Sequence, residues 1–285
     1  MAARQKRESR VMGSVDAGVA GQIHDAARLL ARARHAVALT GAGVSVESGI
    51  PPFRGAGGLW TKYGEPPMDG YQRFLRDPKK AWEERLAPKG PMADLWRKLA
   101  SAAPNPGHFA LSELEGLGVL RCLITQNVDN LHRLAGSRAL LEIHGNATLV
   151  RCISCWARYS REETDLTELP PRCPRCAGVL KSDTVSFGEP IPEDVLERCF
   201  EETRQCDCML VAGTSATVYP AASFPLSVRQ QGGDLIEVNP DATDLSPLCR
   251  VSLRGPSGRL LAALVEEVKR LKRDPGWAGE RRGNR

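Results

Sequence analysis

The chain has 285 residues, of which 42% are hydrophobic and 26% are charged, so it can bury a sizeable core as one large domain or as one domain with an insertion. The formal net charge of +5 comes partly from basic residues near both ends, which we expect to be flexible and solvated. No apolar run reaches the roughly twenty residues of a membrane-spanning helix, and the basic start lacks the apolar segment of a secretion signal. We therefore expect a cytoplasmic protein without a membrane partner.

Short apolar runs alternate with helical patterns along most of the chain. Apolar residues at helical spacing predict helices over 22–34, 106–115, 193–203 and 257–272, the last with Ser257 as its N-cap. Apolar runs that end in polar residues or glycine predict strands over 35–40, 119–125, 140–143, 208–212 and 235–238. These runs show little alternation, which is typical of strands buried on both faces. The order predicts an α/β fold with a doubly wound, Rossmann-like parallel sheet.

Two stretches interrupt this pattern. Residues 51–104 contain many prolines and charges and three tryptophans, and we expect a long loop with short helices that covers the site. Residues 147–185 hold two C-x-x-C pairs and form an inserted module. The predicted domain organisation is a Rossmann-like domain from 21–146 and 186–273 with a zinc-binding module at 147–185. A flexible basic lead over 1–20 and a flexible tail over 274–285 flank it.

The four cysteines of the inserted module have the spacing of a zinc site. Cys152 and Cys155 form one pair, Cys173 and Cys176 the other, and the separation fits the roughly 15–20 residues typical of four-cysteine zinc sites. Four thiolates suit tetrahedral Zn²⁺ and leave no open position, so the predicted ion is structural. Disulfides or two coincidental pairs are the alternatives. The other five cysteines are expected in the core: Cys122, Cys199, Cys206, Cys208 and Cys249.

A glycine-rich loop follows the first predicted strand. Gly41, Ala42 and Gly43 there indicate that a phosphate approaches the backbone N–H groups closely. As a dinucleotide fingerprint the loop is weak, because Val46 stands where the third glycine belongs. Arg54 is either a counter-charge for a pyrophosphate or an ordinary surface arginine.

Polar residues follow the other predicted strands, where ligands bind in open α/β sheets. His144 follows the third strand and is a candidate general base, because its pKa lies near neutrality; a structural histidine is the alternative. The remaining strand-end residues are Gln126, Asn127, Asp129, Gly213, Thr214, Ser215 and Asn239.

These blocks together resemble the sirtuins, a family of NAD-dependent protein-lysine deacylases. The matching blocks occur in the family's order over roughly residues 23–271: GAGVSVESGIPPFRG, PNPGH, TQNVDNLHRLAG, EIHG, the paired C-x-x-C, FGEPIP, GTSATVYPAA and EVNP. The resemblance implies that the chain consumes NAD as a co-substrate and transfers the acyl group of acyl-lysine proteins to ADP-ribose, with release of nicotinamide.

The resemblance also implies a role for each matching position. His144 is expected as the general base, and Asn127 as a second catalytic residue that holds the nicotinamide end together with Asp129. Ile50 and Phe53 are expected to line the nicotinamide pocket. The other implied NAD contacts are Gly41, Ala42, Gly43 and Arg54 at the phosphates, Gln126 at the ribose, and Gly213, Thr214, Ser215 and Asn239 around the adenosine. The implied substrate-binding segment contains Val185, Phe187 and Gly188, which pair with the peptide as an added strand.

The sequence departs from the family's pattern at three places. Pro52 replaces a frequent acidic residue. Ser182 follows Lys181 where proline is usual, with Thr184 and Ser186 in place of larger apolar residues. Residues 82–88 lack the Tyr-x-x-Arg pair of sirtuins that prefer acidic acyl groups. Arg85 offers a positive charge there, but without the tyrosine we predict no preference for succinyl-lysine.

Three alternatives stay open at this stage. Trp60 is either the apolar anchor of a loop that orders around NAD or an ordinary core residue. The scaffold also permits protein ADP-ribosyl transfer. A non-catalytic zinc-ribbon protein that binds nucleic acid or another partner is the third alternative. The acidic residues between the cysteine pairs disfavour phosphate binding, so we expect no nucleic-acid partner.

Overall fold

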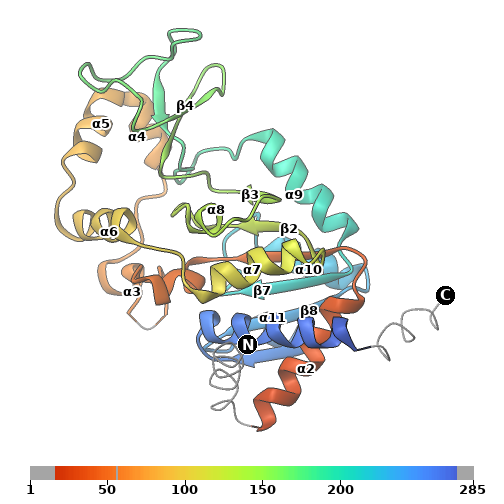
Figure 1. Cartoon of the computed structure of the whole chain (residues 1–285). Helices are drawn as coiled ribbons and strands as arrows, with labels where there is room; N and C mark the ends of the chain where they lie inside the picture. The colour runs from red at the N-terminus through yellow and green to blue at the C-terminus, as the bar shows by residue number, and fades with distance from the viewer. Residues whose placement is uncertain (1–16, 56, 275–285) are drawn as a thin grey trace, which may run out of the picture.

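The computed structural model describes residues 17–55 and 57–274 (Figure 1). The predicted basic lead lies outside these residues up to residue 16, and helix α2 (Ala17–Arg32) begins at residue 17. The predicted tail lies outside them from residue 275 onward. No helix in the described part of the chain is both long enough and apolar enough to cross a bilayer.

A six-stranded parallel sheet forms the centre of the molecule. Its strands lie in the order β3-β2-β1-β7-β8-β9, and every neighbouring pair is parallel. The strands are β1 (Ala36–Thr40), β2 (Leu120–Thr125), β3 (Leu140–Glu142), β7 (Cys208–Ala212), β8 (Asp234–Asn239) and β9 (Val251–Arg254). The predicted fold class and its five strands are confirmed. The sequence analysis missed β9, a short edge strand in which only Leu253 is buried.

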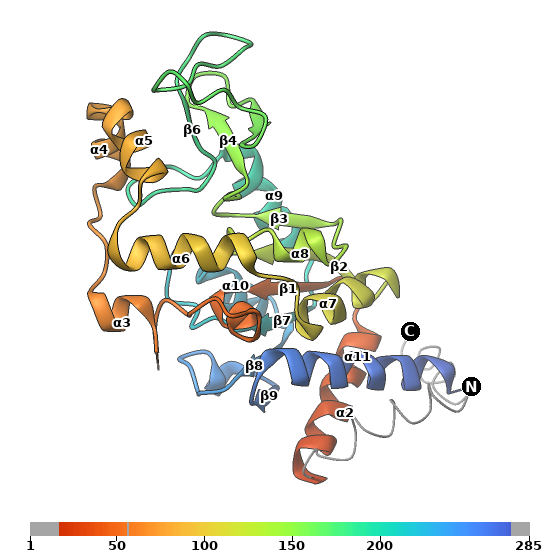
Figure 2. The same ribbon diagram turned by 60° about the vertical axis from the view of Figure 1, so that its left-hand side comes forward.

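Helices cover both faces of the sheet (Figures 1 and 2). Alternate residues of a strand point to opposite faces, so Ala36 and Ala38 pack toward one helical layer, and Val37 and Leu39 toward the other. The first layer contains α2, α7 (Pro106–Gly116) and α11 (Ser257–Arg273). The second contains α9 (Glu193–Gln205) and α10 (Ser223–Gln230). The N-cap prediction for α11 is wrong, because Pro256 occupies that position and Ser257 is the first helical residue.

The proline-rich stretch folds as the predicted loop with short helices. These are α3 (Leu59–Tyr63), α4 (Gly70–Arg76), α5 (Pro78–Leu86) and α6 (Gly90–Ser101). The other short elements of the described chain are η1 (Ala42–Ser48), α8 (Leu131–Leu134) and η2 (Ser246–Leu248).

The cysteine-bearing segment forms a second, antiparallel sheet in the order β5-β4-β6. Its strands are β4 (Leu149–Cys152), β5 (Arg158–Ser160) and β6 (Leu180–Ser182). Helices α4 and α5 pack on this sheet, as both views show (Figures 1 and 2), through the buried Phe74 and Trp82. The Trp82 Nε1–H also donates to the Leu180 carbonyl at 2.8 Å. Periodicity along the chain does not reveal this packing, because the two segments are far apart in sequence.

A buried ion network joins this small sheet to the segment that follows it. Arg151 contacts Asp183 at 3.2 Å and Glu189 at 2.7 Å, and Lys181 contacts Glu189 at 2.9 Å. The Arg151, Asp183 and Glu189 side chains are each only 2% exposed. Breaking such a network leaves an uncompensated buried charge, so it holds residues 183–189 in one position relative to β4 and β6.

Candidate functional site

Two glycine-containing loops, one after β1 and one after β7, meet at the point where the order of strands in the sheet reverses. The Gly43 N–H donates to the Gly213 carbonyl at 2.8 Å. A Cβ on Gly43 would lie 2.6 Å from Gly213 Cα, and Gly213 itself has φ +60°. The loops therefore require glycine because their backbones pack on each other. The sequence analysis had attributed these glycines to a bound phosphate, and the structure supplies a second cause. In a doubly wound sheet, ligands bind at this edge.

Polar side chains from two other strand ends tie the loops together. The Gln126 side chain, after β2, donates to Thr214 Oγ1 at 2.9 Å. The Asn239 side chain, at the end of β8, donates to the Thr214 carbonyl at 2.9 Å. Ser215 lies exposed beside them, with its hydroxyl 3.1 Å from that of Thr217. The structure thus brings together predicted site residues from the ends of β1, β2, β7 and β8.

A buried hydrogen-bond network lies beneath the first glycine loop. Ser45 Oγ donates to Asp129 Oδ2 at 2.6 Å and accepts from Asn127 Nδ2 at 3.1 Å. Asn127 Nδ2 also lies 3.1 Å from the Gly41 carbonyl. The network fixes the two predicted side chains, Asn127 and Asp129, against the loop.

Two buried histidines extend the network, and the sequence analysis missed both, as it missed Ser45. His108 Nδ1 accepts from the Asn105 N–H at 3.2 Å, so its proton is on Nε2, which lies 3.4 Å from Ser45 Oγ. Burial lowers the pKa of His108 to about 4 despite the Asp129 carboxylate. Burial, with His108 nearby, lowers the pKa of His132 to about 3. Both imidazoles are therefore neutral at neutral pH. The capping position of His108 in PNPGH was the available sequence signal.

His144 follows β3 at the edge of the same site. Its Nδ1 donates to the Gln126 carbonyl at 3.0 Å, so Nε2 keeps a free lone pair. Burial lowers the pKa of His144, and the hydrogen bond to Gln126 partly offsets this effect. The next residue, Gly145, has φ +76°, and a Cβ there would lie 2.0 Å from the Asp183 carbonyl oxygen. A neutral, oriented imidazole with a free nitrogen can accept a proton.

The predicted substrate segment passes beside His144. The Val185 N–H donates to the His144 carbonyl at 2.8 Å, and the Tyr71 N–H donates to the Phe187 carbonyl at 3.0 Å. Gly188 has φ +77° and lies against Gln72 and Met68. The segment is therefore held between the histidine and helix α4.

Trp60 joins the loop after Phe53 to this segment. Its ring lies 4.9 Å from the Phe53 ring and 5.6 Å from the Phe187 ring, and Arg54 Cζ lies 4.5 Å above it. Arg54 also pairs with Glu65 at 2.8 Å and reaches Thr217 at 3.4 Å. Trp60 is only half-buried, which favours its interpretation as a loop anchor over a core residue. Ile50 is buried nearby, against Leu95 and Leu131.

The four predicted zinc ligands converge. All four sulfur atoms lie within 4.8 Å of one another, with Cys152 and Cys176 Sγ 3.5 Å apart and Cys155 and Cys173 Sγ 3.6 Å apart. Ligands about 2.3 Å from one tetrahedral Zn²⁺ would be separated by similar distances. The Ser154 and Cys155 N–H groups donate to Cys152 Sγ, as suits a thiolate. The cluster can hold one structural zinc ion.

The sequence profile of the Sir2 family matches residues 41–220. The chain belongs to the Sir2 family. A Sir2 family relative, the NAD-dependent protein deacylase of Pyrococcus abyssi, is 45% identical over 256 residues, which cover 87% of this chain and 99% of the relative. The family resemblance inferred from the sequence motifs is confirmed.

Solved structures of Sir2 proteins share the fold. A mutant Sir2 homologue in complex with 2′-O-acetyl ADP ribose has a TM-score of 0.72 and 45% identity, covering 86% of this chain and 95% of that one. Sir2Af2 bound to a myristoylated histone peptide has a TM-score of 0.66 and 35% identity, covering 89% of this chain and 98% of that one.

The loop-on-loop packing predicts a cost for a side chain at Gly43. We expect Gly43→Ala to lower the free energy of unfolding by about 3 kcal/mol, the upper end of the usual cost of overpacking, because its Cβ meets backbone atoms. Denaturant unfolding measures this. Gly18→Ala is the control, since nothing lies within 4 Å of a Cβ there. A Gly43→Ala chain within about 0.5 kcal/mol of the wild type would contradict the packing argument.

The cysteine cluster predicts that zinc is coupled to folding. We expect wild-type protein to contain about one zinc ion per chain. Cys173→Ser should lose that zinc and melt at a lower temperature, because the ion is bound only in the folded state. Elemental analysis and thermal melting are the measurements, with Cys249→Ser as a control outside the cluster. Unchanged zinc in Cys173→Ser would exclude the cluster as the binding site.

Proposed function

We propose that this member of the Sir2 family is an NAD-dependent protein-lysine deacylase in which His144 is the general base. Its relative is an NAD-dependent protein deacylase at 45% identity, and a related structure holds 2′-O-acetyl ADP ribose. One observation carries the assignment of His144. Its Nδ1 donates to the carbonyl of Gln126, whose side chain contacts the loop after β7, and its own carbonyl accepts from Val185 of the substrate segment, so the imidazole is oriented while Nε2 stays free.

The glycine loops and the strand-end side chains are the proposed NAD site. Ile50, Phe53, Asn127 and Asp129 would hold the nicotinamide end, with Gln126 at its ribose. The hydrogen bonds of Ser45 support this role for Asn127 and Asp129, because they order both side chains. The imidazoles of His108 and His132 nearby are uncharged at neutral pH. The proposed contacts to the phosphates and the adenosine half are Gly41, Ala42, Gly43, Arg54, Gly213, Thr214, Ser215 and Asn239.

The proposed reaction transfers the acyl group of acyl-lysine to ADP-ribose. When bound, NAD would supply an anomeric carbon that the acyl oxygen attacks as nicotinamide leaves, and a ribose hydroxyl that then takes the acyl group, with the lysine amine as leaving group and one water consumed. His144 Nε2 accepts the proton of that hydroxyl, while the Gln126 carbonyl keeps the imidazole oriented. Phe53, Trp60 and Phe187 form an apolar wall that excludes water from the reacting atoms.

The acyl-lysine substrate would lie along Val185, Phe187 and Gly188 as an added strand. Sir2Af2, which binds a myristoylated histone peptide, shares the fold and supports a peptide substrate here. We also propose the division into a Rossmann-like domain and a zinc module, with α4 and α5 joining the module. The cytoplasmic location and the absence of a nucleic-acid partner stay predictions.

Replacing His144 tests its role directly. We expect His144→Ala to lower kcat/KM for an acetyl-lysine peptide about a hundredfold or more, the usual contribution of a general base, with an unchanged melting temperature. Mass spectrometry of O-acetyl-ADP-ribose measures the rate. His24→Ala is the matched control, because this histidine pairs with Glu267 on α11, outside the site. Product formation at the wild-type rate would remove His144 from the mechanism.

The pH dependence follows from the lowered pKa of His144. The base must be neutral, and its pKa lies below the ordinary value of 6.5, so the protonated form appears only at more acidic pH. The kcat/KM of the wild type should therefore fall to half of its plateau value at a pH below 6.5. A decline that begins well above that pH would contradict a buried, neutral base.

A further inference from the structure

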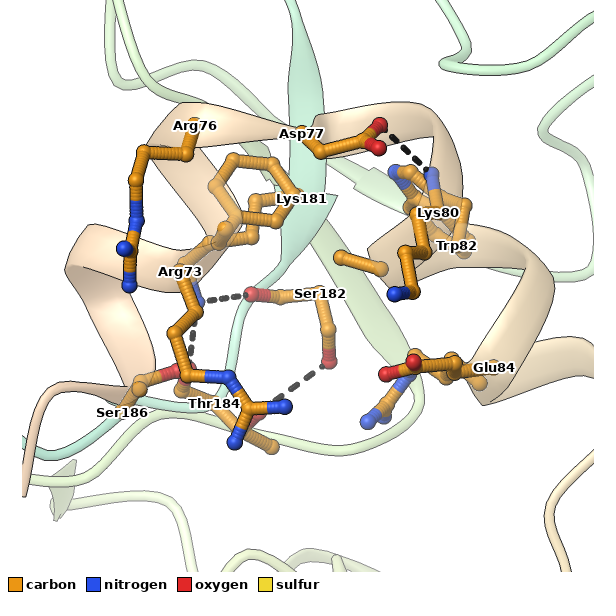
Figure 3. Close-up of a pocket in the computed structure, with 14 residues that line it drawn as sticks. Arg73, Arg76, Asp77, Lys80, Trp82, Glu84, Lys181, Ser182, Thr184 and Ser186 are labelled. Atoms are coloured by element: carbon orange, nitrogen blue, oxygen red, sulfur yellow. Dashed lines mark hydrogen bonds between the residues drawn. The ribbon is translucent and has the colours of Figure 1, made fainter. Parts of the chain in front are cut away.

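A cavity lies beside the substrate segment, on the side of helices α4 and α5. It has a volume of about 470 Å³ and is bounded by α4, α5, β6 and the residues after β6 (Figure 3). None of the proposed NAD contacts lines it. Five cationic side chains line it against two acidic ones: Arg73, Arg76, Lys80, Arg85 and Lys181 against Asp77 and Glu84. The cavity is therefore suited to an anion.

Several of these cations already have partners. Lys181 is buried and pairs with Glu189 at 2.9 Å, and its Nζ also donates to the carbonyls of Ser182 and Thr184. Arg76 pairs with Asp69 at 3.2 Å. These contacts hold the wall of the cavity.

Arg85 differs from them. Its Nε and Nη2 are buried, and neither has a hydrogen-bond partner among the described residues. The guanidinium lies 4.3 Å from the centre of the Trp96 ring, which fixes its plane. Burial, with Arg161 nearby, lowers the pKa of Arg85 to about 10, so the side chain stays charged at neutral pH. A buried charge without an acceptor is unfavourable, and Arg85 lines the cavity, so an anion there would stabilise the charge of its guanidinium.

The substrate segment connects this cavity to the reaction site. Thr184 and Ser186 line the cavity, whereas Phe187 does not line it and contacts Trp60. In the view of Figure 3, Ser182 lies between Arg73 and Lys80. Thr184 and Ser186 are also the positions where this chain has smaller, more polar residues than the family's pattern, which leaves room for the cavity.

Side chains alternate along a strand, so a peptide paired with this segment sends neighbouring residues to opposite sides. If the acyl-lysine lies on the side of Phe187 and His144, the residues directly before and after it lie on the side of Thr184 and Ser186. We propose that the Arg85 cavity binds an anionic side chain next to the acyl-lysine, a carboxylate or a phosphate, and so selects acidic substrate sequences. The inference rests on the proposed deacylase function.

Matched peptides test the proposal. One acetyl-lysine peptide carries Glu on both sides of the lysine, a second carries Gln, and a third carries phosphoserine. With wild-type protein and NAD we expect the KM of the Glu peptide to be about tenfold lower than that of the Gln peptide, the factor for one charge-assisted hydrogen bond. The kcat values should be equal. A gain for phosphoserine beyond that for Glu would identify phosphate as the preferred anion.

Variants assign the effect to the cavity. Arg85→Gln should make the KM values of the Glu and Gln peptides equal. Arg73 is exposed, so Arg73→Gln leaves the core intact, and it should reduce the difference between the two KM values. Lys79→Gln, on the same helix but outside the cavity, should keep it. A difference that persists in both arginine variants would overturn the proposal.

The outcomes also separate this inference from the proposed function. NAD-dependent deacetylation of both peptides with equal KM would overturn the cavity proposal and leave the deacylase function intact. A different result is a lower KM for a succinyl-lysine peptide with neutral neighbours, lost in Arg85→Gln, without a lower KM for the Glu peptide. It would assign the cavity to the acyl chain and overturn the proposal. No deacetylation of any peptide would overturn both.

Discussion

The contact between the two glycine loops is the constraint on which the site depends. β1 and β7 are neighbours in the sheet but far apart in sequence, and the loops after them approach so closely that a Cβ on Gly43 would meet Gly213 Cα at 2.6 Å. This contact places Gly41 and Thr214 where Asn127, Gln126 and Asn239 can hydrogen-bond to them. Side chains from three strand ends and the backbone after β1 thus share one hydrogen-bond network, and the proposed NAD site is built on it.

The small sheet makes the second contribution, because it positions the substrate segment. The buried Arg151–Asp183–Glu189 contacts fix residues 183–189 against β4, and Gly145 allows Asp183 to approach the chain after His144. The segment therefore contacts both the proposed reaction site, through Val185 and Phe187, and the Arg85 cavity, through Thr184 and Ser186. A structural zinc ion at the four cysteines would stabilise this sheet at its far end, so metal binding and substrate placement depend on the same small fold.

Features carried by neighbouring residues could be predicted from the sequence. Apolar runs such as 208–212 identified buried strands, and the C-x-x-C spacing identified the cysteine cluster. Polar residues after strands identified side chains that the fold brings together at one edge of the sheet. Features that depend on tertiary contact could not. The packing of Trp82 on Leu180 joins distant segments, the edge strand β9 lacks a long apolar run, and the Ser45–His108–Asp129 network takes one residue from each of three elements. The packing of Gly43 on Gly213, which requires glycine at both positions, likewise depends on tertiary contact.

The central claim is that the site couples NAD consumption to removal of an acyl group from lysine. Mass spectrometry of an acetyl-lysine peptide incubated with the protein, with and without NAD, tests it most directly. We expect deacetylated peptide, free nicotinamide and O-acetyl-ADP-ribose in equal amounts, and only when NAD is present. Nicotinamide release with ADP-ribose attached to protein, or no release of nicotinamide with acetyl or longer acyl peptides, would contradict it.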